Sequence, residues 1–212
     1  MDLTIVNWIA THLRCPPLDF LMPVITMLGE YGFIWIAVCI FLLARKQTRR
    51  MGCACALSLL IAFVCGEIVL KNIVQRARPF THLPDLTLLI APPGSFSFPS
   101  GHTGSSFAAA CSLTLSNRRN GWWAIPMAVL IAFSRLYLSV HYPTDILAGA
   151  LLGLFSALAA CWLLRGGAQK GTFSIKHRAS HAGLRHAAQR LVIFLAVGGQ
   201  HFVEIRHKAV VH

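Results

Sequence analysis

The sequence predicts an all-α fold, a polytopic membrane bundle of about six helices, and three observations predict it. Hydrophobic residues make up 56% of the 212 residues and charged residues only 12%, whereas a soluble domain is about half apolar and a quarter charged. Several apolar runs reach the roughly 17 to 20 residues that a membrane-spanning helix needs. The net charge of +12 comes from basic residues at the ends of those runs. This placement is typical of topology signals, and no basic face remains for binding nucleic acid.

The first third of the chain predicts a surface helix followed by apolar helices. Residues 1–14 have an apolar face that suits a helix lying on the membrane surface. That face consists of Ile5, Trp8, Ile9 and Leu13. Residues 18–44 are apolar but interrupted by Pro23 and by the Gly-Glu-Tyr-Gly segment at 29–32. This pattern fits either one tilted, kinked span or two shorter helices, and we favour two helices that meet at this segment. Residues 51–70 form a run long enough to span a membrane.

Three more helices and one long loop are predicted after residue 80. Residues 103–116 are rich in Ala, Ser and Gly, and such small residues let helices approach closely, so this helix is expected inside the bundle and away from lipid. Residues 122–138 and 145–164 are again apolar enough to span a membrane. Residues 80–98 are rich in Pro and predict a loop between two helices.

The basic residues predict how the helices are oriented. Basic stretches lie at 44–50, at 117–119 and from Arg165 onward, and such stretches stay on the cytoplasmic side. The opposite helix ends then lie on the outer side. These ends carry Lys71–Pro79, Pro99–His102 and Arg135–Asp145. We therefore expect a multi-pass protein of the inner (plasma) membrane whose functional residues meet at the outer, periplasmic face.

Two parts of the chain differ in composition. Residues 1–165 are expected to form one membrane-embedded domain, and residues 166–212 a basic cytoplasmic tail with a single acidic residue. The only apolar run of the tail, at 191–199, is too short to span a membrane and suits at best a surface helix. The six histidines of the tail show no spacing typical of metal ligands.

The segment Lys-Asn-Ile-Val-Gln-Arg-Ala-Arg-Pro predicts a cluster of cations at the outer end of a helix. Lys71 and Arg78 are seven residues apart, so they share one face of a helix, which Pro79 is expected to end near Arg78. With Arg76 they are three outer cations, read either as interfacial side chains that reach for water or as ligands of an anion such as phosphate. Glu67, one turn before Lys71, is read as the partner that positions it.

The segment Phe-Pro-Ser-Gly-His predicts the start of a helix with a site for an anion. Pro99 stiffens the approach, Ser100 suits the N-cap, and Gly101 leaves room for a ligand near the free N–H groups. His102 follows, with a side chain that changes its protonation near neutral pH. The alternative is an ordinary capped helix with a solvated histidine.

The segment Ser-Arg-Leu-Tyr-Leu-Ser-Val-His-Tyr-Pro-Thr-Asp supplies a histidine and a carboxylate. Arg135 ends an apolar helix, His141 follows, and Asp145 opens the next helix. A carboxylate orients an imidazole and raises its basicity, although an acidic residue also suits a helix N-terminus for its own sake. Together with His102 these residues also describe a facial metal triad. The nearby cations disfavour that reading, so no metal or cofactor is expected.

Taken together, the three segments resemble the type-2 phosphatidic acid phosphatase superfamily of membrane lipid phosphatases over roughly residues 20–165. The matching pattern is Lys71, Arg78 and Pro79, then Pro99, Ser100, Gly101 and His102, then Ser134, Arg135, His141 and Asp145. The resemblance implies that His141 attacks phosphorus to form a phosphohistidine and that Asp145 orients His141. It implies that His102 protonates the leaving oxygen and later activates water. The remaining residues would neutralise the phosphate oxygens: Lys71, Arg78, Ser100, Gly101 and Arg135.

The resemblance also limits the substrate to a membrane lipid phosphate. Undecaprenyl diphosphate is favoured, because the segment Arg-Leu-Tyr-Leu-Ser-Val-His-Tyr-Pro-Thr-Asp-Ile-Leu-Ala-Gly resembles small bacterial members assigned to it. Phosphatidylglycerol phosphate and phosphatidic acid are the alternatives. The soluble vanadium haloperoxidases share these motifs but lack such apolar spans. A non-catalytic lipid carrier with the same fold is the rival from another class. The sequence gives no oligomeric state.

Overall fold

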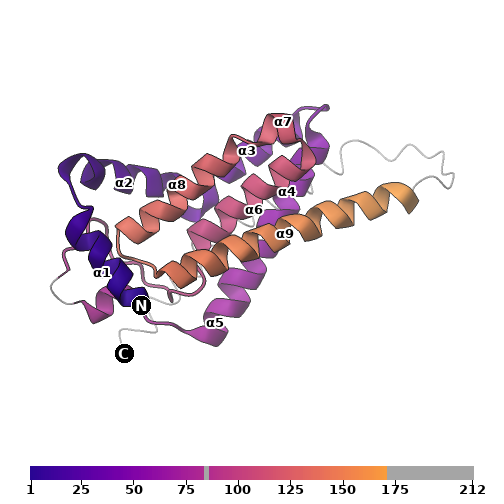
Figure 1. Cartoon of the computed structure of the whole chain (residues 1–212). Helices are drawn as coiled ribbons and strands as arrows, with labels where there is room; N and C mark the ends of the chain where they lie inside the picture. Colours follow the sequence, from indigo (N-terminus) through magenta and orange to yellow (C-terminus); the bar gives the residue numbers. More distant parts are fainter. Residues whose placement is uncertain (84–85, 171–212) are drawn as a thin grey trace. The chain divides into compact units, whose positions relative to one another are not determined.

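The computed structural model describes residues 1–83 and 86–170, and all the regular elements in those ranges are helices (Figure 1). The predicted all-α class is therefore confirmed. The chain divides into one unit, Met1–Trp162, and a second, Leu163–His212. Of the second unit the structure describes only the end of the last helix, so the predicted apolar helix at 191–199 and the tail histidines lie outside the described residues.

Twelve helical elements follow one another along the described part of the chain. They are α1 (Asp2–His12), α2 (Pro16–Leu28), η1 (Glu30–Gly32), α3 (Phe33–Ala44), α4 (Arg49–Phe63), η2 (Val64–Leu70), α5 (Lys71–Val74), η3 (Pro79–His82), α6 (Gly101–Ser116), α7 (Arg118–Gly121), α8 (Ala124–Tyr137) and α9 (Pro143–Lys170). The elements α4, η2 and α5 run on without a break, and η2 within them is a π-helix. The predicted helix at 51–70 is thus present and extends beyond both predicted ends.

The predicted break in the stretch 18–44 is confirmed. Helix α2 and the following η1–α3 segment are bent by 43°. At the bend Tyr31 has a φ of 46° and Gly32 a φ of 69°, a left-handed conformation that interrupts a helix. Pro23 lies inside α2 and does not end it, so the glycine-rich segment alone separates the two helices.

Helix α6 lies at the centre of the bundle, between α4 and α8 and alongside α9 (Figure 1). Half of its 16 residues are buried, and almost all of these are small. A Cβ atom added to Gly149 or Gly153 of α9 would stand 2.7 Å or less from backbone atoms of α6. The two helices thus pack backbone against backbone, as small residues four apart allow in a membrane. The prediction of an interior helix at 103–116 is confirmed.

The predicted spans at 122–138 and 145–164 differ in their outcome. Helix α9 begins at Pro143 and passes Arg165, so it covers the whole predicted span. Helix α8, Ala124–Tyr137, begins two residues after the predicted run starts and ends one residue before it stops, which is about 21 Å of helix at 1.5 Å per residue. It starts late because Asn117 caps a separate short helix, α7, and the chain turns at Trp122 before α8 begins.

The predicted N-terminal helix is present as α1, and the residues of its predicted apolar face divide between the interior and the surface. Ile9 is buried, together with Val6. Ile5 and Trp8 are instead about half exposed, at 45% and 52%. The helix is therefore rotated so that Val6 packs against the bundle while two large apolar side chains remain on its outer side.

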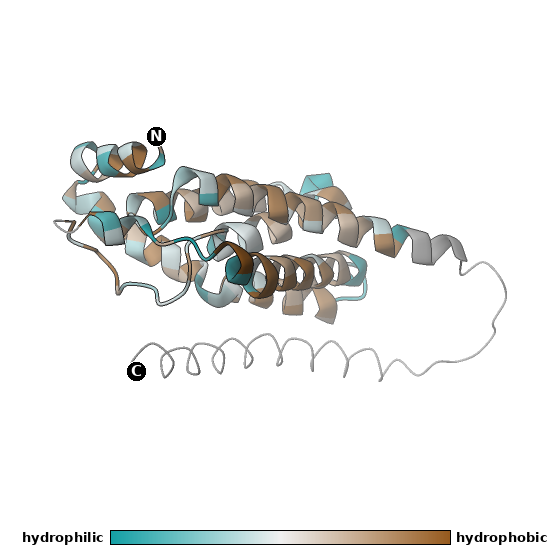
Figure 2. Ribbon diagram, turned by 90° about the horizontal axis from the view of Figure 1, so that it is seen from below, coloured by the Kyte–Doolittle hydropathy of each residue, from teal (hydrophilic) through white to brown (hydrophobic). Residues whose placement is uncertain are grey.

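The described helices carry the surface of a membrane protein. The segments Arg49–His82 and Pro143–Arg165 are long and apolar enough to cross a membrane, and α2 with α3 would add a third span if the bent pair crosses once. Large apolar side chains lie on the outside of the bundle, among them Phe20, Ile73 and Trp162, each more than 70% exposed. Apolar residues also predominate along the helices in Figure 2. Lipid, and not water, is the environment that suits this surface.

Candidate functional site

The three predicted segments converge at one end of α5, α6 and α8. Of the eight predicted site residues, six are buried: Lys71, Arg78, Ser100, Arg135, His141 and Asp145. Such charged side chains are rarely buried without partners. The site is therefore best described through the contacts that hold each of them.

Lys71 and Arg78 meet, but not by the predicted route. Helix α5 ends at Val74 and its C-cap residue Gln75 is left-handed, with a φ of 49°. Arg78 therefore lies in extended backbone beyond the helix, and the prediction that it shares a helix face with Lys71 is wrong. The two side chains converge on the Ser95 hydroxyl, with Lys71 Nζ at 3.4 Å and Arg78 Nη2 at 3.1 Å from Oγ.

The carboxylate of Glu67 holds Lys71 in place. Lys71 Nζ lies 2.7 Å from Glu67 Oε1 and 2.8 Å from Oε2, so the predicted pairing one turn apart is confirmed. The same carboxylate stands beside Gly101, where an added Cβ would collide with Glu67 Oε1 and lie 3.8 Å from Lys71 Nζ. A glycine is thus required at the start of α6 for Lys71 and Glu67 to approach it.

Arg78 is held by backbone carbonyls and faces His141. Its Nε donates to Ser95 O at 2.7 Å and its Nη1 to Val140 O at 2.9 Å. Nη1 also lies 3.3 Å from His141 Nε2. The guanidinium is therefore fixed by neutral acceptors, and no carboxylate of the described residues contacts it directly to offset its positive charge.

Ser100 caps α6 as predicted. Its hydroxyl accepts from the Thr103 backbone N–H at 3.5 Å and from the Thr103 hydroxyl at 3.0 Å. The Ser100 N–H donates to the Asp145 carbonyl at 3.1 Å, which joins the start of α6 to the start of α9. Next to the cap, His102 Nε2 lies 3.4 Å from Glu30 Oε2, so the bend between α2 and α3 supplies a carboxylate to this histidine.

Arg135 is buried near the end of α8 and has one tight contact. Its Nη1 donates to the Thr26 hydroxyl at 2.7 Å. Within the described residues its Nε has no hydrogen-bond partner. A buried guanidinium with an unused donor can bind an anion without first breaking an ion pair.

His141 and Asp145 lie side by side, with a serine between them. His141 Nδ1 is 3.5 Å from Asp145 Oδ2, which is long for a direct hydrogen bond. The Ser97 hydroxyl lies 2.5 Å from the same Oδ2 and 3.5 Å from His141 Nδ1. The Tyr142 N–H donates to Oδ2 at 3.0 Å. The Nδ1 edge of the ring therefore faces Asp145, and the Nε2 edge faces Arg78.

The imidazole of His141 is set up to be neutral. It lies in the turn between α8 and α9, where burial lowers its pKa well below the usual value, and the positive charges of Arg78, Arg135 and Lys71 lower it further. His102 also contributes to this lowering of the pKa, so the predicted cations and both histidines lie in one electrostatic neighbourhood. A neutral imidazole has a free lone pair, which a nucleophile requires.

The sequence did not indicate a role at this site for Glu30, Ser95 or Ser97, and it indicated a different role for Arg76. Arg76 was read as an interfacial side chain or as an anion ligand, but it forms ion pairs with Asp2 at 2.8 Å and Asp145 at 2.7 Å. A signal for the two serines was present, since they alternate in the polar loop directly before Pro99. Glu30 had only its position inside an apolar stretch to distinguish it.

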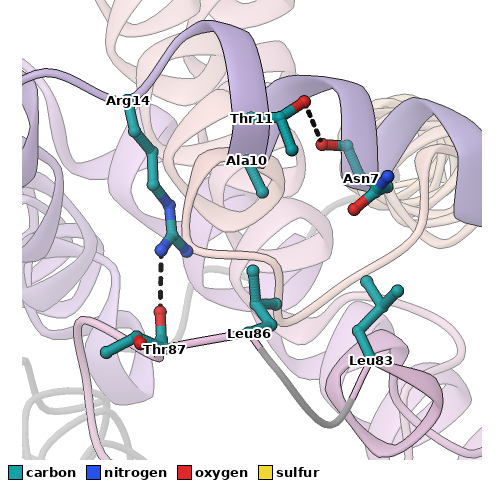
Figure 3. A pocket seen from close by; sticks show the side chains of 7 residues that line it. All are labelled: Asn7, Ala10, Thr11, Arg14, Leu83, Leu86 and Thr87. Atoms are coloured by element: carbon teal, nitrogen blue, oxygen red, sulfur yellow. Dashed lines mark hydrogen bonds between the residues drawn. The ribbon is translucent and has the colours of Figure 1, made fainter.

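Neither a metal cluster nor the pocket in Figure 3 coincides with these residues. Among the residues that the structure describes, no three His, Cys, Asp or Glu side chains are grouped to hold a metal ion. The pocket, of about 380 Å³, is lined by α1, Arg14, Leu83, Leu86 and Thr87 (Figure 3). Its lining includes none of the predicted site residues, and Arg14 closes one side by donating to Thr87 O at 2.7 Å.

Comparison with known proteins finds a matching family model and several similar proteins. A family model described as the PAP2 superfamily matches residues 51–167. An undecaprenyl-diphosphatase of Sulfolobus acidocaldarius is 39% identical over 129 residues, which cover 59% of this chain and 62% of that protein. The chain thus spans less than two thirds of the length of this relative. The bacitracin transport permease protein BcrC of Bacillus licheniformis is 34% identical over 68% of this chain and 72% of its own length.

A solved structure is similar in fold as well. The crystal structure of a transmembrane PAP2-type phosphatidylglycerolphosphate phosphatase from Bacillus subtilis superposes with a TM-score of 0.63. It is 27% identical, and the superposition covers 82% of this chain and 87% of that one. The helical arrangement described above is therefore that of a known membrane protein.

Proposed function

The chain belongs to the PAP2 superfamily, and from this membership we propose that it is an integral membrane phosphatase that hydrolyses a lipid phosphate or diphosphate. The observation that carries the proposal is the environment of His141. One ring edge faces Asp145 and Ser97, the other faces the guanidinium of Arg78, and burial lowers the pKa of the ring, which favours its neutral form. These are the requirements of a nucleophile aimed at an anionic centre.

We propose the following reaction. His141 Nε2 attacks phosphorus, an N–P bond forms, and the P–O bond to the leaving group breaks. His102 gives its proton to the leaving oxygen in that step. In the second step His102 takes a proton from water, the resulting hydroxide attacks phosphorus, and the N–P bond breaks to release phosphate. This is covalent catalysis with one group acting first as acid and then as base.

The cradle for the phosphate oxygens consists of the predicted cations and the start of α6. Arg78 lies 3.3 Å from His141 Nε2, so an oxygen on the phosphorus under attack would lie within its reach. Arg135 offers an unused buried donor, and Lys71 stands beside Gly101. Ser100 and the Gly101 amide complete the group. Such fixed donors stabilise the charge that develops in the transition state.

We propose undecaprenyl diphosphate as the substrate. The support is the name of the relative that is 39% identical. Phosphatidylglycerol phosphate is the first alternative, supported by the solved structure of similar fold, and phosphatidic acid is the second. A non-catalytic lipid carrier remains the rival outside the enzymes. The two histidines and the carboxylate speak against a carrier, which has no use for all three.

We further propose the topology that the sequence predicts: a multi-pass protein of the inner (plasma) membrane with the site on the outer, periplasmic face. Two helices support it. Helix α4 begins at the basic stretch 44–50, and the helix that continues from it ends beside the site. Helix α6 begins at the site and ends at the basic residues 117–119. Residues 1–165 would then be the membrane domain, and residues 166–212 a cytoplasmic tail.

A phosphate-release assay on the purified protein tests the proposal. Undecaprenyl diphosphate, phosphatidylglycerol phosphate and phosphatidic acid would be compared at equal surface concentration in detergent. We expect phosphate release with the highest kcat/KM for undecaprenyl diphosphate. His141→Ala should release none, whereas His12→Ala, which removes an exposed histidine stacked on Trp8, should match the wild type. Binding of these lipids without release of phosphate would identify a carrier.

A further inference from the structure

The two oxygens of the Asp145 carboxylate have different partners. Oδ2 accepts from Ser97 and from the Tyr142 N–H and faces His141. Oδ1 accepts from Arg76 Nη1 at 2.7 Å. The side chain is fully buried, and a buried carboxylate needs such a partner to remain charged. Arg76 therefore fixes the edge of Asp145 that points away from His141.

Arg76 is itself held from three sides. Its Nη2 donates to Asp2 Oδ2 at 2.8 Å, and its Nη1 also donates to the Thr144 hydroxyl at 2.7 Å. Its guanidinium lies over the Tyr142 ring, 3.8 Å from the centroid. The Thr144 hydroxyl in turn donates to Asp2 Oδ2. A continuous chain of contacts thus runs from the first turn of α1 to Asp145.

The carboxylates of Asp2 and Asp145 both bind the guanidinium of Arg76. Burial acts to raise the pKa of Asp2, but the hydrogen bonds from Arg76 and Thr144 outweigh it and hold the pKa below its usual value. Asp2 is therefore ionised at neutral pH and competes with Asp145 for the charge of Arg76. The negative charge that acts on His141 therefore depends on both carboxylates bound to Arg76, those of Asp2 and Asp145.

We propose that Arg76 and Asp2 are positioning residues that act on His141 through Asp145. Arg76 holds the carboxylate in the rotation that turns Oδ2 to His141 and offsets part of its charge. Asp2 binds the same guanidinium and so reduces how much of the Asp145 charge Arg76 offsets. The proposal rests on the proposed function, in which His141 is the nucleophile, and it makes the N-terminal helix a part of the site.

The two residues have opposite charges, so their removal should shift His141 in opposite directions. Arg76→Ala leaves the Asp145 carboxylate uncompensated beside the ring, which favours the protonated imidazole and raises its titration midpoint. Asp2→Asn leaves Arg76 to Asp145 alone, which lowers the midpoint. The other charged groups that act on His141 are unchanged in both variants: Arg78, Arg135, Lys71 and His102. A purely structural role would shift both variants in the same direction or neither.

The test measures kcat, KM and the acidic limb of the kcat/KM profile for the wild type, Arg76→Ala, Arg76→Lys and Asp2→Asn. We expect Arg76→Ala to lose at least about tenfold in kcat, equal to about 1.4 kcal/mol, with KM nearly unchanged and the acidic limb moved to higher pH. Asp2→Asn should lose less and move the limb to lower pH. Arg76→Lys should restore the position of the limb but not the full kcat, because an ammonium lacks the planar fork.

A matched control separates these effects from the loss of any stacked arginine. Arg45 lies over the Phe41 ring at 4.3 Å and is exposed, so Arg45→Ala should leave kcat and the profile unchanged. In the Arg76→Ala background, Asp2→Asn should have no further effect on the limb. The proposal would be overturned if the acidic limb of the kcat/KM profile did not move, or if it moved in the same direction in both single variants.

The His141 ring can also be followed without turnover. Nuclear magnetic resonance of ¹⁵N-histidine, with the His141 signal assigned from His141→Ala, reports its protonation in the free protein. Opposite shifts in Arg76→Ala and Asp2→Asn support the coupling even if the wild type releases no phosphate, in which case only the proposed function fails. Unmoved His141 signals in a wild type that does release phosphate would reject the coupling alone.

Discussion

Ser97 Oγ lies 2.5 Å from Asp145 Oδ2, whereas His141 Nδ1 stands 3.5 Å from the same oxygen. The closest partner of the carboxylate oxygen that faces His141 is thus a hydroxyl. Ser97 also lies 3.5 Å from Nδ1. The hydroxyl therefore helps to decide the distance and angle at which the carboxylate meets the imidazole.

Ser97→Ala should lower kcat by about 10- to 100-fold, because a hydrogen bond to a charged group contributes about 1.5–3 kcal/mol. KM should change little, since Ser97 faces Asp145 and not the phosphate cradle. Ser112→Ala is the matched control, because that buried hydroxyl donates to the Ala109 carbonyl of its own helix. Full activity in Ser97→Ala would mean that Asp145 reaches His141 without it.

Substitutions of the acid–base residues should separate their roles. His102→Ala should abolish turnover on lipid substrates, because the leaving oxygen then departs without a proton. Asp145→Asn should cost less than His141→Ala, because orienting a nucleophile matters less than supplying it. Each variant is measured as phosphate released per folded molecule, with folding judged by size-exclusion chromatography in detergent. Substantial turnover by His102→Ala would assign the proton transfer to another group.

The pH profile should report a neutral His141. Burial and the cations around it lower the pKa of its imidazole, whereas a histidine in water has a pKa of about 6.5. Protonation removes the lone pair, so activity is lost as the pH falls through the lowered value and is kept above it. The acidic limb of kcat/KM should therefore lie below pH 6.5 in the wild type. A limb at or above pH 7 would contradict the assignment.

Vanadate and a chelator should give opposite results. The cradle of Lys71, Arg78 and Arg135 is already positive, so we expect full activity in excess chelator and inhibition by vanadate, which resembles phosphorus in the transition state. The measurement is phosphate release with each reagent alone. Activity that is lost to the chelator and restored by zinc or manganese would show that a metal takes part.

The sequence predicted the helices and indicated the candidate site residues because both depend on local patterns. Apolar runs of about 20 residues indicate spans, and Ser-Gly after Pro99 indicates a helix start. The end of α5 could not be predicted, because Gln75 adopts a left-handed conformation that its residue type does not favour. The true boundary therefore lies four residues before Arg78.

The partners of the site residues were beyond the reach of local patterns. Ser97 and Asp145 are 48 residues apart, and Arg76 and Asp2 are 74 apart. No periodicity connects such pairs, and only the packing of α1, α6 and α9 brings them together. Arg76 therefore looked like one more outer cation, although its partners are two carboxylates of the protein.

Removing residues 171–212 should leave the reaction largely intact. A chain that ends at Lys170 keeps all of α9, and every proposed catalytic and phosphate-binding residue precedes Ile146. The tail is rich in basic residues, which suits attraction to an anionic inner leaflet at about 1 kcal/mol per residue near the surface. We therefore expect turnover per folded molecule within about tenfold of the full chain, which is about 1.4 kcal/mol of barrier, together with lower yield in membranes. A larger loss at equal folded fraction would mean that the apolar segment 190–205 is needed by the membrane domain.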